Sequence, residues 1–516
     1  MATLETTGEA APARAAPPPQ AVSLADWIAV MAGILGAFMA VLDISVTNSS
    51  LPQIQGEIGA TGTEGSWIGT GYLVAEIVMI PLSAWLVRVL GLRNFLLFAV
   101  CGFAMFSVGC GVSGSLTEMI LCRLGQGFTG GAMIPTAMTI VTTRLPPAKQ
   151  PIGFALFGVT AIMAPVFGPL VGGWLTDNAN WHYIFFLNVP VAIGLIALLF
   201  AGLPRSPARW SDFLRADFVG IAGLVMALGG LTVVLEDGQK EQWFESTMIC
   251  WTAAIAFVGA GLIAASQLTR PDPVIKLKLI LGPGFGGAFF VSIVVGAALY
   301  SIPYVLPVFL GNIAGYNAEQ TGQVVLISGI PSLLLLPVTP FLVRIMDLRI
   351  IAAVGLVFFA LSCFVTTGMT VDTGSAQFVL PQILRGVGQA LIMTPLSQSA
   401  TAGVPREDAG DAAGLYNMAR NLGGSLGLAL TATLVDFRTA FHFQQISQSA
   451  SSNVYSSQAY VAQVGMGQLS HTVAVQAMVM AYSDCFWVLG IALILVLPFV
   501  LLLRPLPRGA SSSPAH

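Results

Sequence analysis

Long apolar runs, separated by short breaks that carry glycine, proline or charge, follow one another from residue 26 to residue 504. A helix needs about 20 apolar residues to cross a bilayer, so this pattern predicts fourteen membrane-spanning helices. The predicted spans are 26–47, 66–88, 95–113, 117–140, 152–175, 183–203, 217–236, 248–267, 285–309, 322–343, 350–369, 376–398, 410–435 and 483–504. An even number of spans places both termini on the same side of the membrane.

The composition fits a chain that folds in lipid. Of the 516 residues, 55% are hydrophobic and 9% are charged, and the mean hydropathy is +0.82. A soluble domain carries about 25% charged residues, and a globule with far fewer would not cover its surface in water. The net charge of −3 gives no reason to expect a nucleic acid partner. These features predict an all-α integral membrane protein surrounded by lipid.

The lysines and arginines test the span count, because cytoplasmic loops are enriched in them. With a cytoplasmic N-terminus, most of the 21 fall in predicted cytoplasmic segments: Arg14, Arg88, Arg93, Arg144, Lys149, Arg205, Arg209, Arg215, Arg270, Lys276, Lys278, Arg344, Arg349, Arg406, Arg504 and Arg508. Lys240 and Arg438 fall on the external side, and Arg123, Arg385 and Arg420 lie within predicted spans. This partition predicts fourteen spans with both termini in the cytoplasm.

The segments outside the spans are short, with one exception. Residues 1–25 are Ala/Pro-rich, without the apolar core of a signal peptide, and are expected to form a disordered cytoplasmic tail. Residues 505–516 form a second cytoplasmic tail. Residues 437–482 are Gln/Ser-rich and are predicted to form an external loop with a short helix near 470–482. This loop is either a solvated connector or a gate or docking surface for an external partner.

The chain contains a weak internal repeat. The range 117–140 carries RLGQGFTGGAMIPT and the range 376–398 carries RGVGQALIMTPLS, which makes Arg385 the counterpart of Arg123. The spans that follow them also resemble each other and pair Gly168 with Gly424. Transporters are often built from duplicated halves. We therefore expect six-helix bundles at 26–203 and 285–504, with two inserted transmembrane helices and their linkers at 204–284.

No pattern of residues indicates catalysis or a cofactor. The six cysteines lie in or beside apolar runs without a CxxC pair, and the four histidines lie in loops or the tail. The chain has no G-x-x-x-x-G-K-[ST] stretch for ATP, no HExxH and no Ser/His/Asp constellation. We expect no enzyme, no cofactor and no metal site.

Arg123 stands in an otherwise apolar run, where a charge is costly unless it is paired or hydrated and marks a functional site by default. Its partner is expected on another span: Asp43, Glu76, or a water-filled path between them. Asp43 lies near the external end of the first span, and Glu76 lies mid-span in the second, one turn after Tyr72. A carboxylate removed from water favours its neutral form, which suits proton binding. The alternatives are a solvated helix-end aspartate at 43 and a structural ion pair at 76.

A second set of polar residues lies in the later spans. Arg420 is flanked by Asn417 and Asn421, and Tyr300 lies in the span 285–309. These side chains either line a cavity or pack between helices, and Arg385 is either functional or purely structural.

The glycines of the fourth and fifth spans have a spacing that lets helices approach closely in lipid. They are Gly127, Gly130, Gly131, Gly168, Gly172 and Gly173. Pro165 and Pro169 each remove a helix hydrogen bond, so the fifth span is either a hinge or a generic packing element.

Several of these motifs resemble the major facilitator superfamily, in particular its fourteen-span drug:proton antiporters of the EmrB/QacA type. The similarity covers about residues 25–504. It rests on LDISVTNSSLPQI at 42–54, Arg123-Leu-Gly-Gln126-Gly127, Gly168-Pro169-Leu-Val-Gly172-Gly173 and WHYIFFLNVPV at 181–191. One motif departs, because AWLVRVLGLRNF at 84–95 has Arg88 where the family usually has aspartate. In having a basic residue at this position, the chain resembles the EmrB-like branch of the family.

The resemblance implies a proton-driven multidrug exporter that moves amphipathic drug-like compounds across the bacterial inner membrane by alternating access. It assigns proton coupling to Asp43, Arg123 and Glu76, a substrate cavity to Glu76, Tyr72, Gln126, Asn417, Arg420 and Tyr300, and the antiporter motif to Gly168, Pro169, Gly172 and Gly173. Which of Asp43 and Glu76 is the main coupling acid is left open.

Two other functions stay open. The chain is alternatively an exporter of a specific aromatic or fatty acid that acts as the inner-membrane part of a tripartite pump, with a periplasmic adaptor and an outer-membrane channel. A nutrient symporter is the third possibility, against which the Gly168–Gly173 motif argues.

Overall fold

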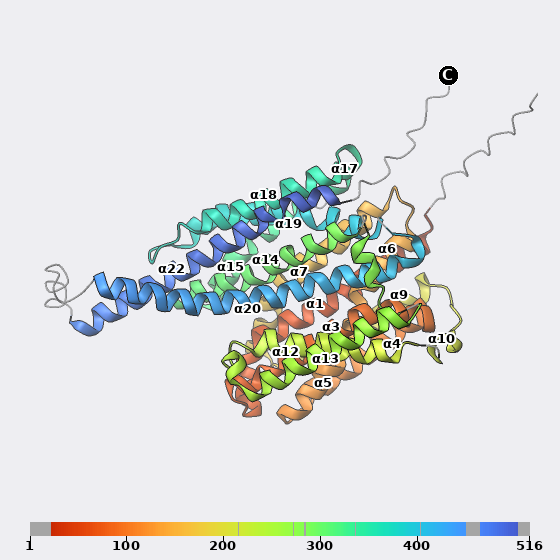
Figure 1. The fold of residues 1–516 in the computed structure, drawn as a ribbon, viewed down its shortest axis with the longest axis horizontal. Coiled ribbons are helices and arrows are strands. Elements are labelled where there is room, and N and C mark those ends of the chain that lie inside the picture. The colour runs from red at the N-terminus through yellow and green to blue at the C-terminus, as the bar shows by residue number, and fades with distance from the viewer. Residues whose placement is uncertain are drawn as a thin grey trace, which may run out of the picture.

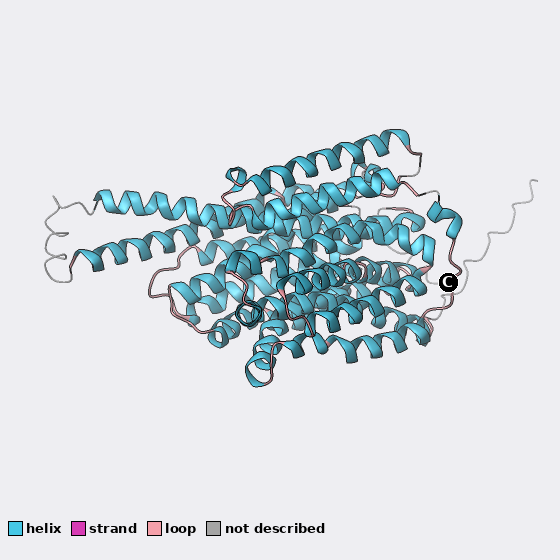
Figure 2. Cartoon of the chain, turned by 90° about the horizontal axis from the view of Figure 1, so that it is seen from below, coloured by secondary structure: helices cyan, strands magenta, loops and turns pink. Residues whose placement is uncertain are grey.

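All regular elements in the described part of the chain are helices (Figure 1, Figure 2). The computed structural model describes residues 22–214, 216–271, 273–282, 285–335, 337–402, 404–449 and 465–503. Both predicted tails, 1–25 and 505–516, therefore lie largely or wholly outside the described residues.

The first half of the chain forms a bundle of long helices with short connections. Its elements are α1 (Leu24–Ile58), α2 (Gly62–Gly65), α3 (Trp67–Leu90), α4 (Leu92–Gly111), α5 (Leu116–Gly130), α6 (Met133–Arg144), α7 (Gln150–Asn178), α8 (His182–Phe186) and α9 (Asn188–Gly202). α1 packs against α6, α7 and α9, while α3 and α4 both pack against α5.

The middle of the chain adds two more long helical segments. They comprise α10 (Trp210–Leu214), α11 (Phe218–Leu224), the π-helical turn η1 (Val225–Gly229), α12 (Gly230–Asp237), η2 (Trp243–Glu245), α13 (Thr247–Thr269) and η3 (Leu277–Leu281). α13 packs along α11 and α12, and α12 contacts α3 and α20 of the two bundles. Only 11% of the most apolar stretch of α13 is buried inside the protein, so this helix faces lipid along most of its surface.

The last part of the chain forms the second bundle. Its elements are α14 (Gly286–Asn312), α15 (Ala318–Leu326), α16 (Gly329–Leu335), α17 (Val338–Ile345), α18 (Leu348–Thr366), α19 (Ser375–Ala402), η4 (Arg406–Asp408), α20 (Ala409–Ser449), α22 (Met466–Leu495) and η5 (Leu497–Leu502). α14 packs against α20, α18 packs against α19, and α22 contacts both α18 and α20. The two bundles meet where α3 and α6 contact α20 and where α7 contacts α15, α16, α17 and α19.

The helices agree with the predicted spans. Each of the fourteen predicted ranges falls on one helix or on consecutive helices. Within the described residues, nine helices are long and apolar enough to cross a membrane, or up to eleven if each bent pair is one span. The three predicted spans that fail this test are those that carry the buried arginines Arg123, Arg385 and Arg420, and the first of them is divided between α5 and α6, which have 15 and 12 residues.

Local signals in the sequence set several helix ends. Ser23 caps α1, because its side chain accepts a hydrogen bond from the Asp26 N–H. The Asp26 carboxylate in turn accepts a hydrogen bond from the Ser23 N–H. Gly59 ends α1 in a left-handed conformation with φ 74°, which costs glycine little because it has no Cβ. Asn317 and Gln320 form the same capping box at α15.

The predicted external loop at 437–482 is wrong on either side of residues 450–464, because both parts are helical, but the short helix expected near 470–482 lies within α22. α20 continues to Ser449 and α22 begins at Met466, so both helices project beyond the bundle as an antiparallel pair (Figure 2). Asp484 of α22 contacts two residues of α20. Its Oδ2 accepts a hydrogen bond from Arg438 Nε at 2.5 Å and lies 2.7 Å from His442 Nε2. These contacts hold the projecting ends of the two helices together. The polar composition of this segment did not by itself predict two long helices. Residues 450–464 lie outside the described part of the chain.

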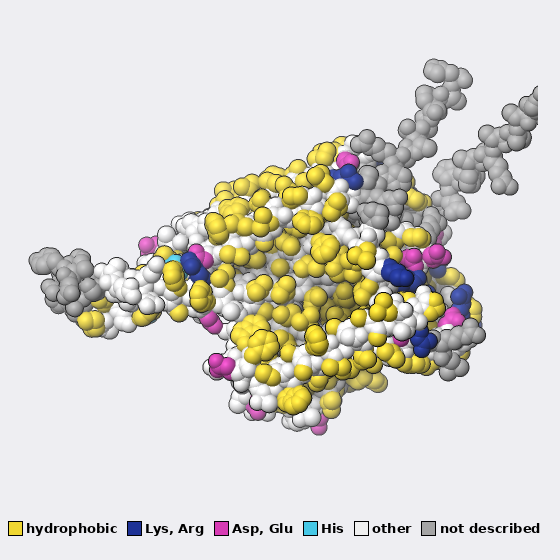
Figure 3. Space-filling view, in the orientation of Figure 1, with side chains coloured by type: hydrophobic (Ala, Val, Ile, Leu, Met, Phe, Trp, Pro, Cys, Tyr) yellow, Lys and Arg dark blue, Asp and Glu magenta, His cyan; other side chains and the backbone are white. Residues whose placement is uncertain are grey.

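The surface follows the pattern of a membrane bundle. Apolar side chains cover the middle of the visible face, whereas charged side chains gather at its two ends (Figure 3). Both described ends of the chain lie at the same end of the bundle (Figure 1).

Candidate functional site

A buried ion pair joins α1 to α5 inside the first bundle. Arg123 Nη1 lies 2.5 Å from Asp43 Oδ2, and both side chains are about 1% exposed. A buried arginine keeps its charge, so the carboxylate compensates a positive charge that lipid and packed helices do not solvate. Of the partners that the sequence left open for Arg123, the structure places Asp43 in direct contact.

Three further polar side chains complete this network. Gln126 Oε1 accepts from Arg123 Nη1 at 2.9 Å, and Gln126 Nε2 donates to Ser107 Oγ at 2.7 Å. Asn188 Nδ2 donates to Asp43 Oδ1 at 2.7 Å and lies 3.1 Å from Ser107 Oγ. The carboxylate is therefore held from two sides, by α5 and by α9.

Sequence reasoning missed Ser107 and Asn188. Each is one polar residue within an apolar run, and Asn188 lies in the quoted stretch WHYIFFLNVPV. A polar side chain at this depth is a signal in itself, but it does not say which other span it faces.

Tyr72 forms the wall of the network on the α3 side. The Arg123 guanidinium lies 4.4 Å from the centre of the Tyr72 ring, and Arg123 Nε donates to the Ile68 carbonyl oxygen at 3.1 Å. The Tyr72 hydroxyl donates to the Ala40 carbonyl oxygen at 3.3 Å. Tyr72 and Gln126, which the sequence assigned to a substrate cavity, are thus fully buried parts of the ion-pair network.

Glu76 follows Tyr72 by one helical turn and belongs to a separate centre between the bundles. Its side chain is 2% exposed, and the ion pairs among the described residues do not include it. The cations whose charges act on it are Arg420 of α20 and Arg123 of α5. A buried acid that feels the charge of two arginines and has no ion-pair partner among the described residues is suited to gain or lose a proton or to bind a cationic ligand.

The side chains of α20 on this face are incompletely hydrogen-bonded. Arg420 Nη1, Asn417 Oδ1 and the Tyr416 hydroxyl are buried and lack a hydrogen-bond partner among the described residues. Asn417 Nδ2 donates to the Ala413 carbonyl oxygen at 2.8 Å and contacts Met138 Sδ of the other bundle at 3.1 Å. Unsatisfied buried polar atoms are rare in native proteins, so this face fits water or a bound ligand.

Tyr300 and Glu236 continue the polar surface along α20. The Tyr300 hydroxyl of α14 donates to Asn421 Oδ1 at 3.1 Å, and Tyr300 remains 37% exposed. Ser425 Oγ donates to Glu236 Oε1 of the inserted helix α12 at 2.6 Å. Glu236 had no place in the sequence analysis, because it stands near the end of a predicted span where a solvated acid is common.

The residues that the resemblance assigns to an antiporter motif lie along the contact between α7 and α1. A Cβ on Gly168 would collide with Ser45, and one on Gly172 would lie 2.9 Å from the Val46 carbonyl oxygen. A Cβ on Gly173 would meet nothing within 4 Å. α7 bends by 40° between Pro165 and Phe167, with Pro169 in its second segment. Two of the three motif glycines are thus needed for close packing, and the third is not.

A group of ion pairs joins the two bundles at the end where α1 begins and η5 ends. Arg88 Nη1 of α3 lies 2.6 Å from Asp411 Oδ2 of α20, and Lys276 Nζ lies 2.6 Å from Asp408 Oδ1 and 3.6 Å from Asp411 Oδ2. Burial disfavours the charge on Lys276, but the hydrogen bond to Asp408 and the charge of Asp411 outweigh it and raise the pKa of Lys276. Arg88 therefore makes the bridge between bundles at the position where the family motif usually has an acid.

The predicted equivalence of Arg123 and Arg385 is wrong by three residues. Arg123 Nε donates to the Ile68 carbonyl oxygen at 3.1 Å, and the matching bond in the second bundle is made by Gln382 Nε2, which donates to the Val324 carbonyl oxygen at 3.2 Å. The predicted alignment matched the two arginines because they are the same residue type. The contacts between helices instead make Gln382 the counterpart of Arg123.

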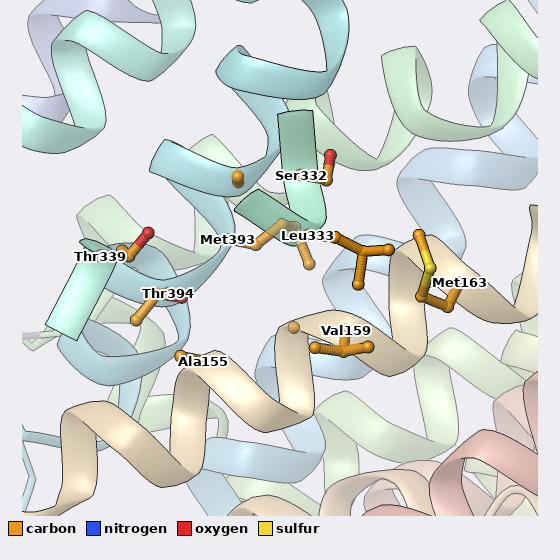
Figure 4. Close-up of a pocket in the computed structure, with 10 residues that line it drawn as sticks. Ala155, Val159, Met163, Ser332, Leu333, Thr339, Met393 and Thr394 are labelled. Atoms are coloured by element: carbon orange, nitrogen blue, oxygen red, sulfur yellow. The ribbon is translucent and has the colours of Figure 1, made fainter. Parts of the chain in front are cut away.

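A pocket lies on the opposite side of the bundle interface from α3 and α20. Figure 4 shows Ala155, Val159 and Met163 of α7 facing Leu333 of α16 and Met393 of α19. It is lined mostly by apolar side chains and contains none of the charged residues of the site. Within the described residues, no group of three or more His, Cys, Asp or Glu side chains is arranged to hold a metal ion.

The chain resembles known membrane transporters over most of its length. Residues 33–428 match the Major Facilitator Superfamily. The chain is 33% identical to the colistin resistance protein EmrB of Acinetobacter baumannii over 82% of this chain and 83% of the relative, and 30% identical to the multidrug export protein EmrB of Escherichia coli over 92% and 94%. It is 28% identical to the fatty acid resistance protein FarB of Neisseria gonorrhoeae over 95% and 98%.

Solved structures support the same fold. The proton:xylose symporter XylE superposes with a TM-score of 0.62 at 12% identity, covering 94% of this chain and 97% of XylE. The human organic anion transporter MFSD10 superposes with a TM-score of 0.60 at 14% identity, covering 91% and 99%. The helical fold of the described residues and the sequence matches agree, and the chain therefore belongs to the major facilitator superfamily as a relative of its EmrB drug exporters.

Proposed function

We propose that this chain exports amphipathic drug-like compounds across the bacterial inner membrane in exchange for protons. The observation that carries the proposal is the fully buried Asp43–Arg123 pair, in a chain similar to multidrug export proteins over most of its length. A proton-coupled carrier needs an acid that is shielded from bulk water and can exchange its charge with a neighbouring cation. Both termini then lie in the cytoplasm, at the end that carries the Arg88–Asp411 bridge.

The mechanism is an exchange of proton and substrate at two acids. Tyr72 and Glu76 lie one turn apart on α3, so the ion-pair network and the Glu76–Arg420 centre share one helix face. Protonation of Asp43 or Glu76 from outside releases the substrate outward, and deprotonation toward the cytoplasm resets the site. The glycine contacts of α7 with α1 and the bend at Pro165 provide the hinge for this exchange.

The ion pairs near the termini are the gate of this mechanism. With Arg88 on Asp411, the two bundles are held together at the cytoplasmic end. Separation of these groups opens the cytoplasmic side, and substrate then enters between α3 and α20.

The proposal is tested by a drug-susceptibility panel on cells that lack or overexpress the protein. Overexpression is expected to raise resistance to lipophilic cations, and a proton uncoupler is expected to abolish the gain. Unchanged susceptibility across the panel, or resistance that survives the uncoupler, would contradict it.

A second candidate function is the export of an aromatic or fatty acid. It is favoured by Nη1 of Arg420, which has no hydrogen-bond partner in the described part of the chain and would bind a carboxylate, and by the similarity to FarB. Fatty and aromatic acids belong in the same panel. Resistance confined to acids, and lost in Arg420→Gln but retained in Glu76→Gln, would favour this candidate over the first.

We also propose that the projecting ends of α20 and α22 bind a periplasmic adaptor, which would connect the protein to an outer-membrane channel. The pair extends beyond the bundle and is held together by Asp484 with Arg438 and His442 (Figure 2). Shortening both helices together, by removing residues 440–480 and joining the ends with a short linker, is expected to abolish co-purification with an adaptor while the protein stays in the membrane. Retained co-purification would contradict this role.

A further inference from the structure

The second bundle contains an arginine without a counter-ion among the described residues. Arg385 of α19 is 5% exposed, and its Nε has no hydrogen-bond partner among the described residues. Its Nη1 donates to Gln382 Oε1 at the long distance of 3.3 Å. No described carboxylate forms an ion pair with it. Because the guanidinium stays protonated in proteins, a full positive charge is buried here with little compensation.

The two bundles carry the same motif with two residues exchanged. The first reads Arg123-x-x-Gln126-Gly127 and the second reads Gln382-x-x-Arg385-Gly386. The closing glycines occupy matching positions. A Cβ on Gly127 would collide with the Tyr72 carbonyl oxygen, and one on Gly386 with the Ser328 carbonyl oxygen. Tyr72 lies four residues after Ile68, whose carbonyl oxygen accepts from Arg123. Ser328 likewise lies four residues after Val324, whose carbonyl oxygen accepts from Gln382.

The second site also differs from the first in that no acid lines it. In the first bundle the first, third, fourth and sixth spans supply the network around Asp43. In the second bundle the corresponding helices α14, α18, α19 and α22 surround a cavity instead, lined by Ile302, Leu306, Ser362, Thr366, Gln382 and Arg385 together with aromatic side chains. The cavity therefore lies beside the uncompensated guanidinium, in the bundle position where the first half has its carboxylate.

The size and donors of the cavity restrict what fits. Its free space is about 10 Å³, which is at the lower limit of what one water molecule needs, so a halide, which is larger than water, requires a small outward shift of the lining side chains. The Ser362 and Thr366 hydroxyls donate to carbonyl oxygens of their own helix at 2.6 and 2.7 Å, which leaves the guanidinium as the main donor. The charge therefore carries the argument: a single uncompensated guanidinium beside a small, mostly apolar cavity favours one small monovalent anion, whereas sulfate or a drug carboxylate would need far more room.

We propose that the second bundle binds a halide-sized monovalent anion, chloride in the cell, beside Arg385 in the cavity between α14, α18, α19 and α22. The bound anion supplies the negative charge that Asp43 supplies in the first bundle. This site is separate from the proton-coupled acids of the proposed export function.

Thermal unfolding of the purified full-length protein in detergent tests the site. The unfolding midpoint of the wild type is expected to rise and saturate with sodium chloride or bromide at constant ionic strength, and not with gluconate or sulfate, because a ligand that binds only the folded state stabilises it. Arg385→Gln is expected to lose this response. Arg420→Gln, which removes another buried arginine with an unpaired nitrogen, is expected to keep it. A wild type without the response, or an Arg385→Gln variant that keeps it, overturns the proposal.

Two further measurements stay informative if Arg385→Gln fails to fold. Leu306→Asp places a carboxylate in the cavity lining and is expected to remove the chloride response while Arg385 remains. In bromide-soaked crystals of the wild type, an anomalous peak is expected beside Arg385. Density without anomalous signal there would identify water as the occupant and contradict the proposal.

Discussion

At the scale of single residues, Asp43 and Arg123 depend on each other. Both are almost fully buried, and Gln126 and Asn188 hold the carboxylate in place. Removing one partner of a buried pair leaves an unpaired charge, which typically costs about 3 to 5 kcal/mol. The stability of the first bundle is thus tied to the group that we assign to proton coupling.

Asp43→Asn is therefore expected to lower the free energy of unfolding by about 3 kcal/mol or more, measured by thermal or denaturant unfolding in detergent. The matched control is Glu76→Gln, which is expected to have a smaller effect because Glu76 makes no ion pair. The double variant Asp43→Asn/Arg123→Gln is expected to recover part of the loss. Equal destabilisation by Asp43→Asn and Glu76→Gln would show that the pair does not stabilise the fold.

The sequence identified several of these residues but not all of their contacts. Arg123 and Asp43 were found because a charge in an apolar run requires a partner. Their pairing required the three-dimensional arrangement, since Glu76 was an equal candidate. Arg385 was misaligned because a short repeat can be matched by residue type in more than one register.

At the scale of helices, the contact between α1 and α7 depends on glycine at defined positions. Gly168 and Gly172 face α1, whereas the neighbouring Gly173 faces open space. The sequence motif did not separate these positions, because three glycines within six residues look equivalent until the helix orientation is known.

Gly172→Ala is expected to push α1 and α7 apart, because its Cβ would overlap Ser49 and approach the Val46 carbonyl oxygen. Overpacking of this kind costs about 1 to 3 kcal/mol, and export is expected to fall with it. Gly173→Ala is the control and should match the wild type in both unfolding and drug efflux. Loss of efflux in Gly173→Ala alone would refute the packing role assigned to Gly172.

The Arg88–Asp411 bridge also acts between helices. Arg88→Glu places two acids together, and the bundles are expected to separate at the cytoplasmic end, which distance measurements between spin labels on α3 and α20 would detect. Restoring the pair in reverse, with Arg88→Asp and Asp411→Arg together, is expected to return the distances toward those of the wild type. Unchanged distances in Arg88→Glu would rule out this bridge as a gate.

At the scale of the whole molecule, hydropathy predicted the fold well. Every predicted span coincides with helix, because the requirement for about 20 apolar residues is imposed by the bilayer. The extension of α20 and α22 beyond the bundle was not predicted. It depends on contacts between two helices, such as Arg438 with Asp484, and not on any periodicity within either one.

In the proposed mechanism, the arrangement of the two bundles separates the proton-coupling pair from the acid that faces the substrate. The ion-pair network lies inside the first bundle, whereas Glu76 and Arg420 lie where α3 and α20 meet. A change of charge at Asp43 can thus reach the bundle interface through α3, which carries both Tyr72 and Glu76.

The central claim, exchange of protons for substrate, is tested most directly in proteoliposomes that contain the purified protein and an internal pH dye. Addition of a lipophilic cation such as ethidium is expected to cause proton movement in the opposite direction to the cation, in the wild type but not in Asp43→Asn or Glu76→Gln. Substrate-driven proton flux that persists in both variants, or transport of ethidium without any proton movement in the wild type, would contradict it.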